Sequence, residues 1–145
     1  MYQLIILIQG IPFAAPPVGK LRFGAPQPVE PWTEPIDVSG YSDIKCVQYG
    51  YMTDGKPSVN GQEDCLYLTV YVPANKTITE PMPVMFWIYG GSLTAGANHF
   101  KEYGPMKWMA EEVIIVEPLY RLGPFGFTYL GIPEAPGNQG FLDLF

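Results

Sequence analysis

Gly90-Gly91-Ser92 follows a run of apolar residues and carries the clearest chemical signal in the chain. Glycines directly after a buried strand let the backbone turn sharply and leave its N–H groups pointing at a ligand. Such donors stabilise the negative charge that develops on a carbonyl oxygen under attack, and one donor is worth about 3 to 4 kcal/mol in the transition state. A bare Gly-Gly pair more often marks a strand end that binds nothing, so other segments must decide between the two interpretations.

The sequence offers this segment no obvious nucleophile or base. No motif places a base near the Ser92 hydroxyl, so we do not expect Ser92 to attack a substrate. The single histidine, His99, lies in a polar stretch and is expected to be an exposed loop residue. No Gly-x-Ser-x-Gly pattern occurs in the 145 residues. We therefore expect this chain, taken alone, to be catalytically inactive.

Apolar runs bounded by turn residues predict the strands that hold the segment. Residues 83–89 and 113–116 are continuous apolar runs, which is typical of strands covered on both faces of a sheet. Residues 103–111, between them, have apolar side chains at helical spacing. Two buried strands joined by a helical crossover predict a βαβ unit with a parallel sheet.

Further strands are predicted before this unit. Residues 1–8 are apolar, but they are too short to span a membrane and lack the basic region and cleavage site of a signal peptide. We expect a buried strand there, with natural residues missing before Met1. Residues 66–72 are rich in aromatic and β-branched side chains, so they predict another strand.

The end of the chain is expected to be rich in turns. Residues 123–131 predict a turn and a short strand, and residues 136–138 predict a turn. From Gly140 onward the sequence is compatible with the start of a helix.

Composition excludes several classes of protein. Hydrophobic residues make up 48% and charged residues 15%, against about 25% charged in a typical globular protein, so the chain is rich in core residues. Its net charge of −6 repels phosphate backbones, which disfavours nucleic-acid binding. No internal repeat is present.

Two features agree with an oxidising, secretory compartment. Cys46 and Cys65 enclose a polar, turn-rich segment that a disulfide would close, although two unrelated buried thiols are the alternative. Asn75-Lys76-Thr77 fits the N-glycosylation acceptor pattern, which also occurs by chance. We therefore expect a secreted or extracellular protein.

The sequence resembles the type-B carboxylesterases and cholinesterases, and some details resemble insect members of that family. The resemblance covers nearly the whole chain from Ile8 onward. It is carried by five short segments that occur in the same order as in the family. They lie at residues 10–19, 63–68, 87–93, 120–127 and 135–138.

This resemblance implies an α/β fold. Residues 1–145 would form the N-terminal part of a carboxylesterase domain, with a mixed, mostly parallel and incomplete α/β-hydrolase sheet. The catalytic serine, acid and histidine of such enzymes would lie downstream, because the triad order in this fold is serine, acid, histidine. The implied function is that of a serine carboxylesterase acting on a small-molecule carboxylic ester. No cofactor or metal is implied.

The resemblance also assigns roles to individual residues. Gly91 and Ser92 would be the oxyanion-hole donors, with Gly90 shaping the turn. Cys46 and Cys65 would form the family's first disulfide. Buried ion pairs would join the following residues: Arg22 with Glu63, and Arg121 with Asp143. The alternative for each charge is a solvated side chain.

Several departures from the family pattern keep other functions open. Ser92 replaces a glycine, Leu93 replaces an aromatic residue, and Glu117 places a charge in an apolar strand. Leu119 and Leu144 replace residues that are usually polar. These changes are compatible with a catalytically silent, neuroligin-like interaction protein at the cell surface, or with a pseudogene.

The segment between the two cysteines also bears on the substrate. It contains Tyr49 and Tyr51 but no tryptophan. Cholinesterases use an aromatic residue in this loop to hold a quaternary ammonium group. Choline esters are therefore disfavoured as substrates, and apolar esters are favoured.

Overall fold

The computed structural model describes residues 5–38, 43–53, 56–74, 81–98 and 112–145. Three of the predicted features lie outside these ranges: the helix at residues 103–111, His99 and the acceptor asparagine Asn75.

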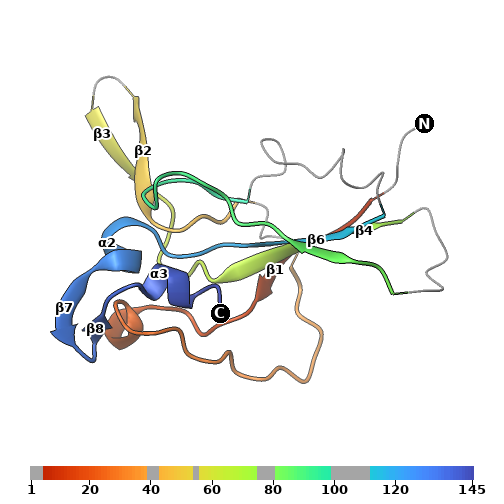
Figure 1. The fold of residues 1–145 in the computed structure, drawn as a ribbon, viewed down its shortest axis with the longest axis horizontal. Helices are drawn as coiled ribbons and strands as arrows, with labels where there is room; N and C mark the ends of the chain where they lie inside the picture. The colour runs from red at the N-terminus through yellow and green to blue at the C-terminus, as the bar shows by residue number, and fades with distance from the viewer. Residues whose placement is uncertain (1–4, 39–42, 54–55, 75–80, 99–111) are drawn as a thin grey trace.

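A mixed sheet forms the centre of the described chain (Figure 1). Its strands, in spatial order, are β1 (Ile5–Pro12), β4 (Tyr67–Pro73), β6 (Ile114–Pro118) and β5 (Val84–Phe86). The β1–β4 and β4–β6 pairs are antiparallel, whereas β5 and β6 are parallel. The predicted mixed sheet of a partial α/β-hydrolase is thereby confirmed. Among its described strand pairs one is parallel and two are antiparallel, so this part of the sheet is not mostly parallel.

Alternation along β4 explains how this strand packs. Thr69, Tyr71 and Pro73 are buried, while the residues between them are only partly buried. Across the antiparallel pair, Tyr71 faces Ile115 of β6, and the two form a small buried cluster. One face of the sheet is therefore packed at this point, as expected when successive side chains point to opposite faces.

The side chains of the two edge strands, β1 and β5, are more exposed than the sequence predicts. Side chains of β1 such as Ile6 are about half exposed, and Val84 and Phe86 of β5 are also exposed. Residues 1–4 lie outside the described ranges. The expectation of strands within residues 1–8 and 83–89 is confirmed at Ile5–Pro12 and Val84–Phe86, and the expectation of their burial is wrong for Ile6, Val84 and Phe86. The physical reason is position, because β1 and β5 are the two edges of the described sheet.

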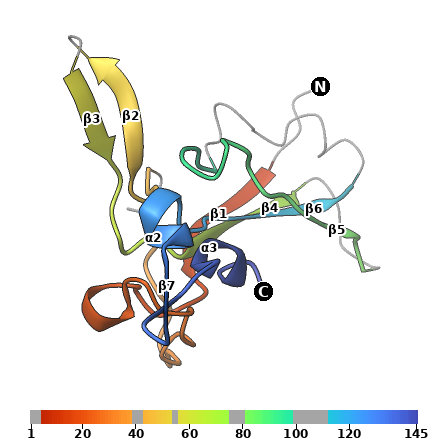
Figure 2. The same ribbon diagram turned by 60° about the vertical axis from the view of Figure 1, so that its left-hand side comes forward.

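A β-hairpin stands apart from the sheet. It consists of β2 (Gln48–Thr53) and β3 (Lys56–Asn60), which pair antiparallel. The hairpin lies between Cys46 and Cys65 and projects away from the sheet in both views (Figures 1 and 2). Its turn residues were predicted, but the strand pairing was not.

Short elements complete the fold at the end of the sheet away from the N-terminus (Figure 2). They are η1 (Gly19–Leu21), α2 (Gly123–Phe127), β7 (Tyr129–Ile132), β8 (Ala135–Pro136) and α3 (Gln139–Leu142). A short helix therefore replaces the first part of the turn predicted at residues 123–131, and the predicted terminal helix begins one residue earlier than expected.

The main hydrophobic cluster lies around the two cysteines. It also contains residues that follow β5 and β6, so it supports the chain where these two strands end. Its buried members are Ala14, Cys46, Cys65, Leu66, Tyr89, Ala97, Leu119, Tyr120 and Leu122. Among the helices of the described residues, none is long and apolar enough to cross a bilayer.

Candidate functional site

The Gly90–Ser92 segment follows β5 at the edge of the sheet where β5 and β6 both end. These strands are parallel, so the chain leaves both of them at the same edge. Trp87 donates its N–H to the carbonyl of Val116 (2.9 Å) and marks the last pairing of this segment with β6. In open α/β sheets, ligands bind outside the carboxyl ends of the strands. The segment therefore has the right position for a ligand site.

The N–H groups of Gly91 and Ser92 take no part in sheet pairing. Within the described part of the chain, no backbone hydrogen bond has either group as its donor, and both residues are exposed. The loop closes instead on the carbonyl of Gly91, which accepts from the N–H groups of Thr94 (3.0 Å) and Ala95 (3.1 Å). Two adjacent N–H groups are thus available to an external acceptor.

The loop has positive φ at three successive residues, namely 141° at Gly91, 55° at Ser92 and 61° at Leu93. For residues with a side chain, the left-handed region costs roughly 1 to 2 kcal/mol. A Cβ atom at Gly91 would collide with the carbonyl oxygen of Ala95, so only glycine fits there. Ser92 occupies the left-handed region, as its substitution for a glycine suggests.

Two tyrosines hold the start of this loop. Tyr89 precedes Gly90, and Tyr120 follows β6. Their rings are stacked with centroids 4.6 Å apart, and both side chains are buried. Each hydroxyl group donates to the other residue's carbonyl oxygen, at 3.1 and 3.0 Å. Burial raises the pKa of both hydroxyl groups, so they remain protonated donors.

Two further contacts hold the middle and the end of the loop. Gly123, at the start of α2, donates its N–H to the carbonyl of Leu93 (2.7 Å). The side-chain amide of Gln48 donates to the carbonyl of Gly96 (2.8 Å) and accepts from the Gly96 N–H (2.9 Å). The loop is therefore attached to three separate parts of the fold.

Cys46 and Cys65 form a disulfide with Cα atoms 5.1 Å apart, which confirms the pairing that the resemblance implied. Both residues are buried, and the bridge closes the base of the β2–β3 hairpin. Gln48 lies two residues after Cys46. The disulfide therefore anchors the segment that contacts the end of the loop.

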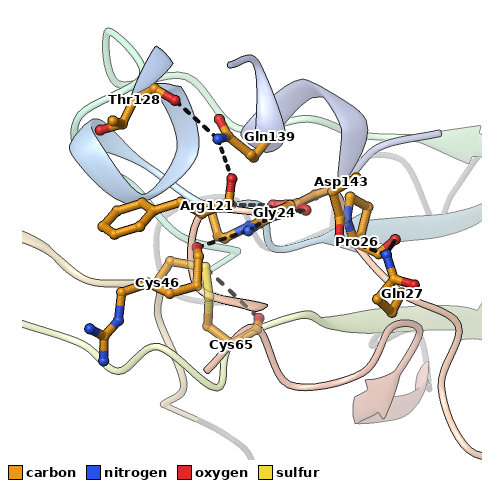
Figure 3. Close-up of polar contacts among 12 residues, drawn as sticks. Gly24, Pro26, Gln27, Cys46, Cys65, Arg121, Thr128, Gln139 and Asp143 are labelled. Atoms are coloured by element: carbon orange, nitrogen blue, oxygen red, sulfur yellow. Dashed lines mark hydrogen bonds and ion pairs between the residues drawn. A yellow bond between two sulfur atoms is a disulfide. The ribbon is translucent and has the colours of Figure 1, made fainter. Parts of the chain in front are cut away.

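Arg121 and Asp143 form a buried ion pair, and Figure 3 shows their side chains in contact. The guanidinium donates through Nη2 (2.6 Å) and Nε (2.9 Å) to the two carboxylate oxygens, and the Arg121 N–H adds a third contact at 3.0 Å. Nη1 donates to the carbonyls of Arg22 (3.1 Å) and Gly24 (2.9 Å). The pair thus joins the segment after β6, the end of α3 and the segment after η1.

Arg22 and Glu63 are also paired, with Nε 2.6 Å from Oε2, but this pair lies near the surface. The Arg22 side chain is 42% exposed and that of Glu63 is 25% exposed, so the expectation of a buried pair is wrong here. The hydrogen bond to the Glu63 carboxylate and its charge raise the pKa of Arg22. Exposed pairs of this kind contribute little to stability.

Comparison with known proteins places this arrangement in a family. The sequence model of the Carboxylesterase family matches residues 5–145. The chain belongs to the carboxylesterase family.

Individual relatives support the same assignment. The chain is 46% identical to a juvenile hormone esterase of Tribolium castaneum, over 93% of this chain and 22% of that protein. It is 41% identical to acetylcholinesterase 1 of Caenorhabditis elegans, over 93% and 23%. It is 40% identical to liver carboxylesterase B-1 of Rattus norvegicus, over 97% of this chain and 27% of that protein. The chain spans about a quarter of the length of these relatives.

Within this carboxylesterase segment, Glu117 is the charge that the sequence singled out as unusual in an apolar strand. It is 2% exposed on β6. Burial raises the pKa of Glu117 to about 7, although the neighbouring Tyr71 hydroxyl stabilises the charged form and opposes the shift. The carboxyl is therefore protonated in part near neutral pH, which lowers the cost of burying it.

Several residues that hold the loop or its surroundings in this carboxylesterase segment were missed by the sequence reasoning. Tyr89 and Tyr120 each follow an apolar strand, and this shared position was the available signal. Gln139 is fully buried; its amide donates to the carbonyls of Phe23 and Thr128 (Figure 3). For Gln48 and Gln139 no local pattern was available, because their partners are distant in sequence.

Proposed function

We propose that this chain supplies the oxyanion-stabilising loop of a serine carboxylic-ester hydrolase. Gly91 and Ser92 are the N–H donors, and Gly90 shapes the turn that presents them. The single observation that carries the proposal is that both N–H groups lie outside sheet pairing in an exposed loop at the carboxyl edge of β5 and β6. Membership of the carboxylesterase family supports this use of the loop.

The chemistry assigned to the loop is electrostatic. A serine hydroxyl from the rest of the protein attacks the ester carbonyl carbon while a histidine takes the hydroxyl proton. The carbonyl oxygen becomes negatively charged, and the two N–H groups stabilise it. When the carbonyl reforms, the alcohol leaves with a proton from the same histidine, and the acyl group remains on the serine. Water then attacks this acyl-serine with the histidine as base, and the carboxylic acid leaves as the serine recovers its proton. Residues 1–145 contain no Gly-x-Ser-x-Gly pattern, so this segment alone is expected to be inactive.

The proposed substrate is a small carboxylic ester with an apolar or neutral alcohol group. The segment between Cys46 and Cys65 contains no tryptophan to bind a quaternary ammonium group, which supports this preference over choline esters. The named relatives include both a juvenile hormone esterase and an acetylcholinesterase, so both substrate types belong in the test.

The proposed location is an oxidising, extracellular compartment. The Cys46–Cys65 disulfide supports it, because such bonds persist where thiols are not kept reduced. Asn75, which lies outside the described residues, is the proposed glycosylation site. Secretion from cultured cells and a mass shift on glycosidase treatment, absent in an Asn75→Gln variant, would test both points.

The test of the activity uses the full-length protein. We expect it to hydrolyse p-nitrophenyl butyrate faster than butyrylthiocholine, and to be inactivated by one equivalent of an organophosphate. A folded, secreted protein that shows neither turnover nor labelling would instead support the silent, neuroligin-like alternative. The positive φ of Ser92 and Leu93 favours this second candidate, because a residue with a side chain that leaves this costly region would move the two N–H groups out of line.

A further inference from the structure

We infer that Gln48 is a positioning residue for the Gly91 and Ser92 donors, and that it acts by holding Gly96, which lies at the end of their loop. This inference rests on the proposed function. Gln48 belongs to the β2–β3 hairpin and is 48 positions from Gly96 in sequence. It does not touch the predicted donors, so its effect must pass through the loop backbone.

The contact between Gln48 and Gly96 uses both polar ends of the side-chain amide. Nε2 donates to the Gly96 carbonyl (2.8 Å), and Oε1 accepts from the Gly96 N–H (2.9 Å). This pairing imitates the way in which two backbone strands exchange hydrogen bonds. Nε2 also donates to the carbonyl of Cys46 (3.0 Å). A shorter or apolar side chain at this position cannot reproduce these contacts.

Gly96 in turn sets the position of the start of the loop. Its φ is 125°, and a Cβ atom there would lie 2.6 Å from the carbonyl oxygen of Gly90 and 2.6 Å from the ring of Tyr89. The backbone of Gly96 therefore packs directly on Gly90, the residue before the two donors. Any displacement of Gly96 is transmitted to Gly90, because close-packed atoms cannot absorb it.

The other side of Gln48 is rigidly held. Cys46 is buried and disulfide-bonded to Cys65. Just before it, the carbonyl of Lys45 accepts a hydrogen bond from the N–H of Gln62 (2.9 Å), which closes the base of the hairpin. Gln48 thus connects the disulfide-bonded segment to the loop of residues 90–96. It fixes the Gly96 end of that loop because its own backbone follows the buried Cys46.

The test uses the full-length protein and p-nitrophenyl butyrate as the probe. In Gln48→Ala we expect kcat to fall about 10- to 100-fold, because a small misplacement of transition-state donors has an effect of this size. KM should change by less than about threefold, since the substrate's ground-state contacts are retained. The matched control is Gln27→Ala, because the exposed Gln27 amide donates, among the described residues, to the neighbouring carbonyls of Ala25 and Pro26 alone. This control should retain kcat.

A second variant provides a pH readout that a purely structural role would not move. In Gln48→Glu, the new side chain accepts from the Gly96 N–H in either charge state, but it donates to a carbonyl only when protonated. We expect the ratio of its kcat to that of the wild type to rise as the pH falls. A ratio that stays constant with pH would contradict the inference. If Gln48→Ala does not fold, this variant decides the question.

Amide hydrogen exchange separates this inference from the proposed function. We expect exchange of the hydrogen-bonded N–H groups of residues 94–96 to be at least about tenfold faster in Gln48→Ala than in the wild type, with β4 unchanged. If the wild type hydrolyses esters and Gln48→Ala keeps both its kcat and its slow exchange, the inference is wrong and the function stands. If the wild type hydrolyses no ester, the proposed function fails, and the catalytic part of the inference fails with it.

Discussion

The Tyr89 and Tyr120 hydroxyl groups each form hydrogen bonds to the other residue's backbone, but Tyr89 forms two and Tyr120 forms one. The Tyr89 hydroxyl donates to the Tyr120 carbonyl (3.1 Å) and accepts from the Tyr120 N–H (3.3 Å). The Tyr120 hydroxyl makes one contact, to the Tyr89 carbonyl (3.0 Å). The residues follow β5 and β6, so the pair fixes the distance between the two chain segments that leave this edge of the sheet.

The asymmetry predicts unequal mutational effects. Tyr89→Phe leaves two buried backbone groups of Tyr120 without this partner and should lower the free energy of unfolding by about 2 to 3 kcal/mol. Tyr120→Phe removes one hydrogen bond and should cost about 1 kcal/mol. Urea unfolding of the full-length variants measures both values. Tyr129→Phe is the control, because Tyr129 is 72% exposed. Equal costs for the two buried tyrosines would contradict this account.

The donor loop predicts opposite outcomes at neighbouring positions. Gly91→Ala forces a Cβ atom against the Ala95 carbonyl and should lower kcat about 100- to 1,000-fold, as the loss of one oxyanion donor does. Ser92→Gly relieves a left-handed serine and should stabilise the protein by about 1 kcal/mol while preserving kcat. Ester hydrolysis and thermal unfolding of the full-length variants check these expectations. An active Gly91→Ala variant would rule out the proposed donor geometry.

The buried ion pair predicts a large cost when one partner loses its charge. Asp143→Asn leaves the Arg121 guanidinium buried without its counter-charge, and we expect a loss of about 3 to 5 kcal/mol in the free energy of unfolding. Glu63→Gln at the exposed pair is the comparison and should have a much smaller effect. Chemical denaturation at low and high salt distinguishes the two pairs, because salt screens only the exposed one effectively.

Glu117 predicts a pH dependence of stability. Its folded-state pKa of about 7 lies above the ordinary value of 4.5, so the folded chain binds this proton more tightly than the unfolded chain does. The stabilisation is fully present below pH 4.5 and is lost as the pH rises through 7. We expect Glu117→Gln to remove about 3 kcal/mol of this pH dependence, the equivalent of the shift from 4.5 to about 7. Melting temperatures between pH 4.5 and 8 would show it as a flatter curve, and parallel curves would contradict it.

The isolated segment of residues 1–145 is expected to associate through its sheet. Ile6, Val84 and Phe86 lie exposed on its two edge strands, where unpaired backbone groups and apolar side chains promote aggregation. We expect strong binding of a hydrophobic dye, poor solubility and no ester hydrolysis. Sedimentation and dye fluorescence measure the first two properties. A monomeric segment with a cooperative thermal transition would contradict this expectation.

The strands and the family segments were predictable because their signals are local. The apolar, β-branched residues in the runs at 66–72 and 113–116 are enough to predict β4 and β6. The Gly90-Gly91 pair likewise predicts a turn, because the conformational freedom of glycine does not depend on its neighbours. The shortening of the run at 83–89 to a three-residue strand was not predictable, because strand length depends on the neighbour that continues the pairing.

By itself, the sequence determined where the strands of the central sheet lie, which residues turn the chain after β5, and which family supplies the pattern. The tertiary structure alone decided that Gln48 meets Gly96, that Tyr89 meets Tyr120, and that Arg22 stays near the surface while Arg121 is buried. The reason is physical. Apolar periodicity specifies that a residue is to be buried, whereas the partner of a polar side chain depends on how distant segments cross in space.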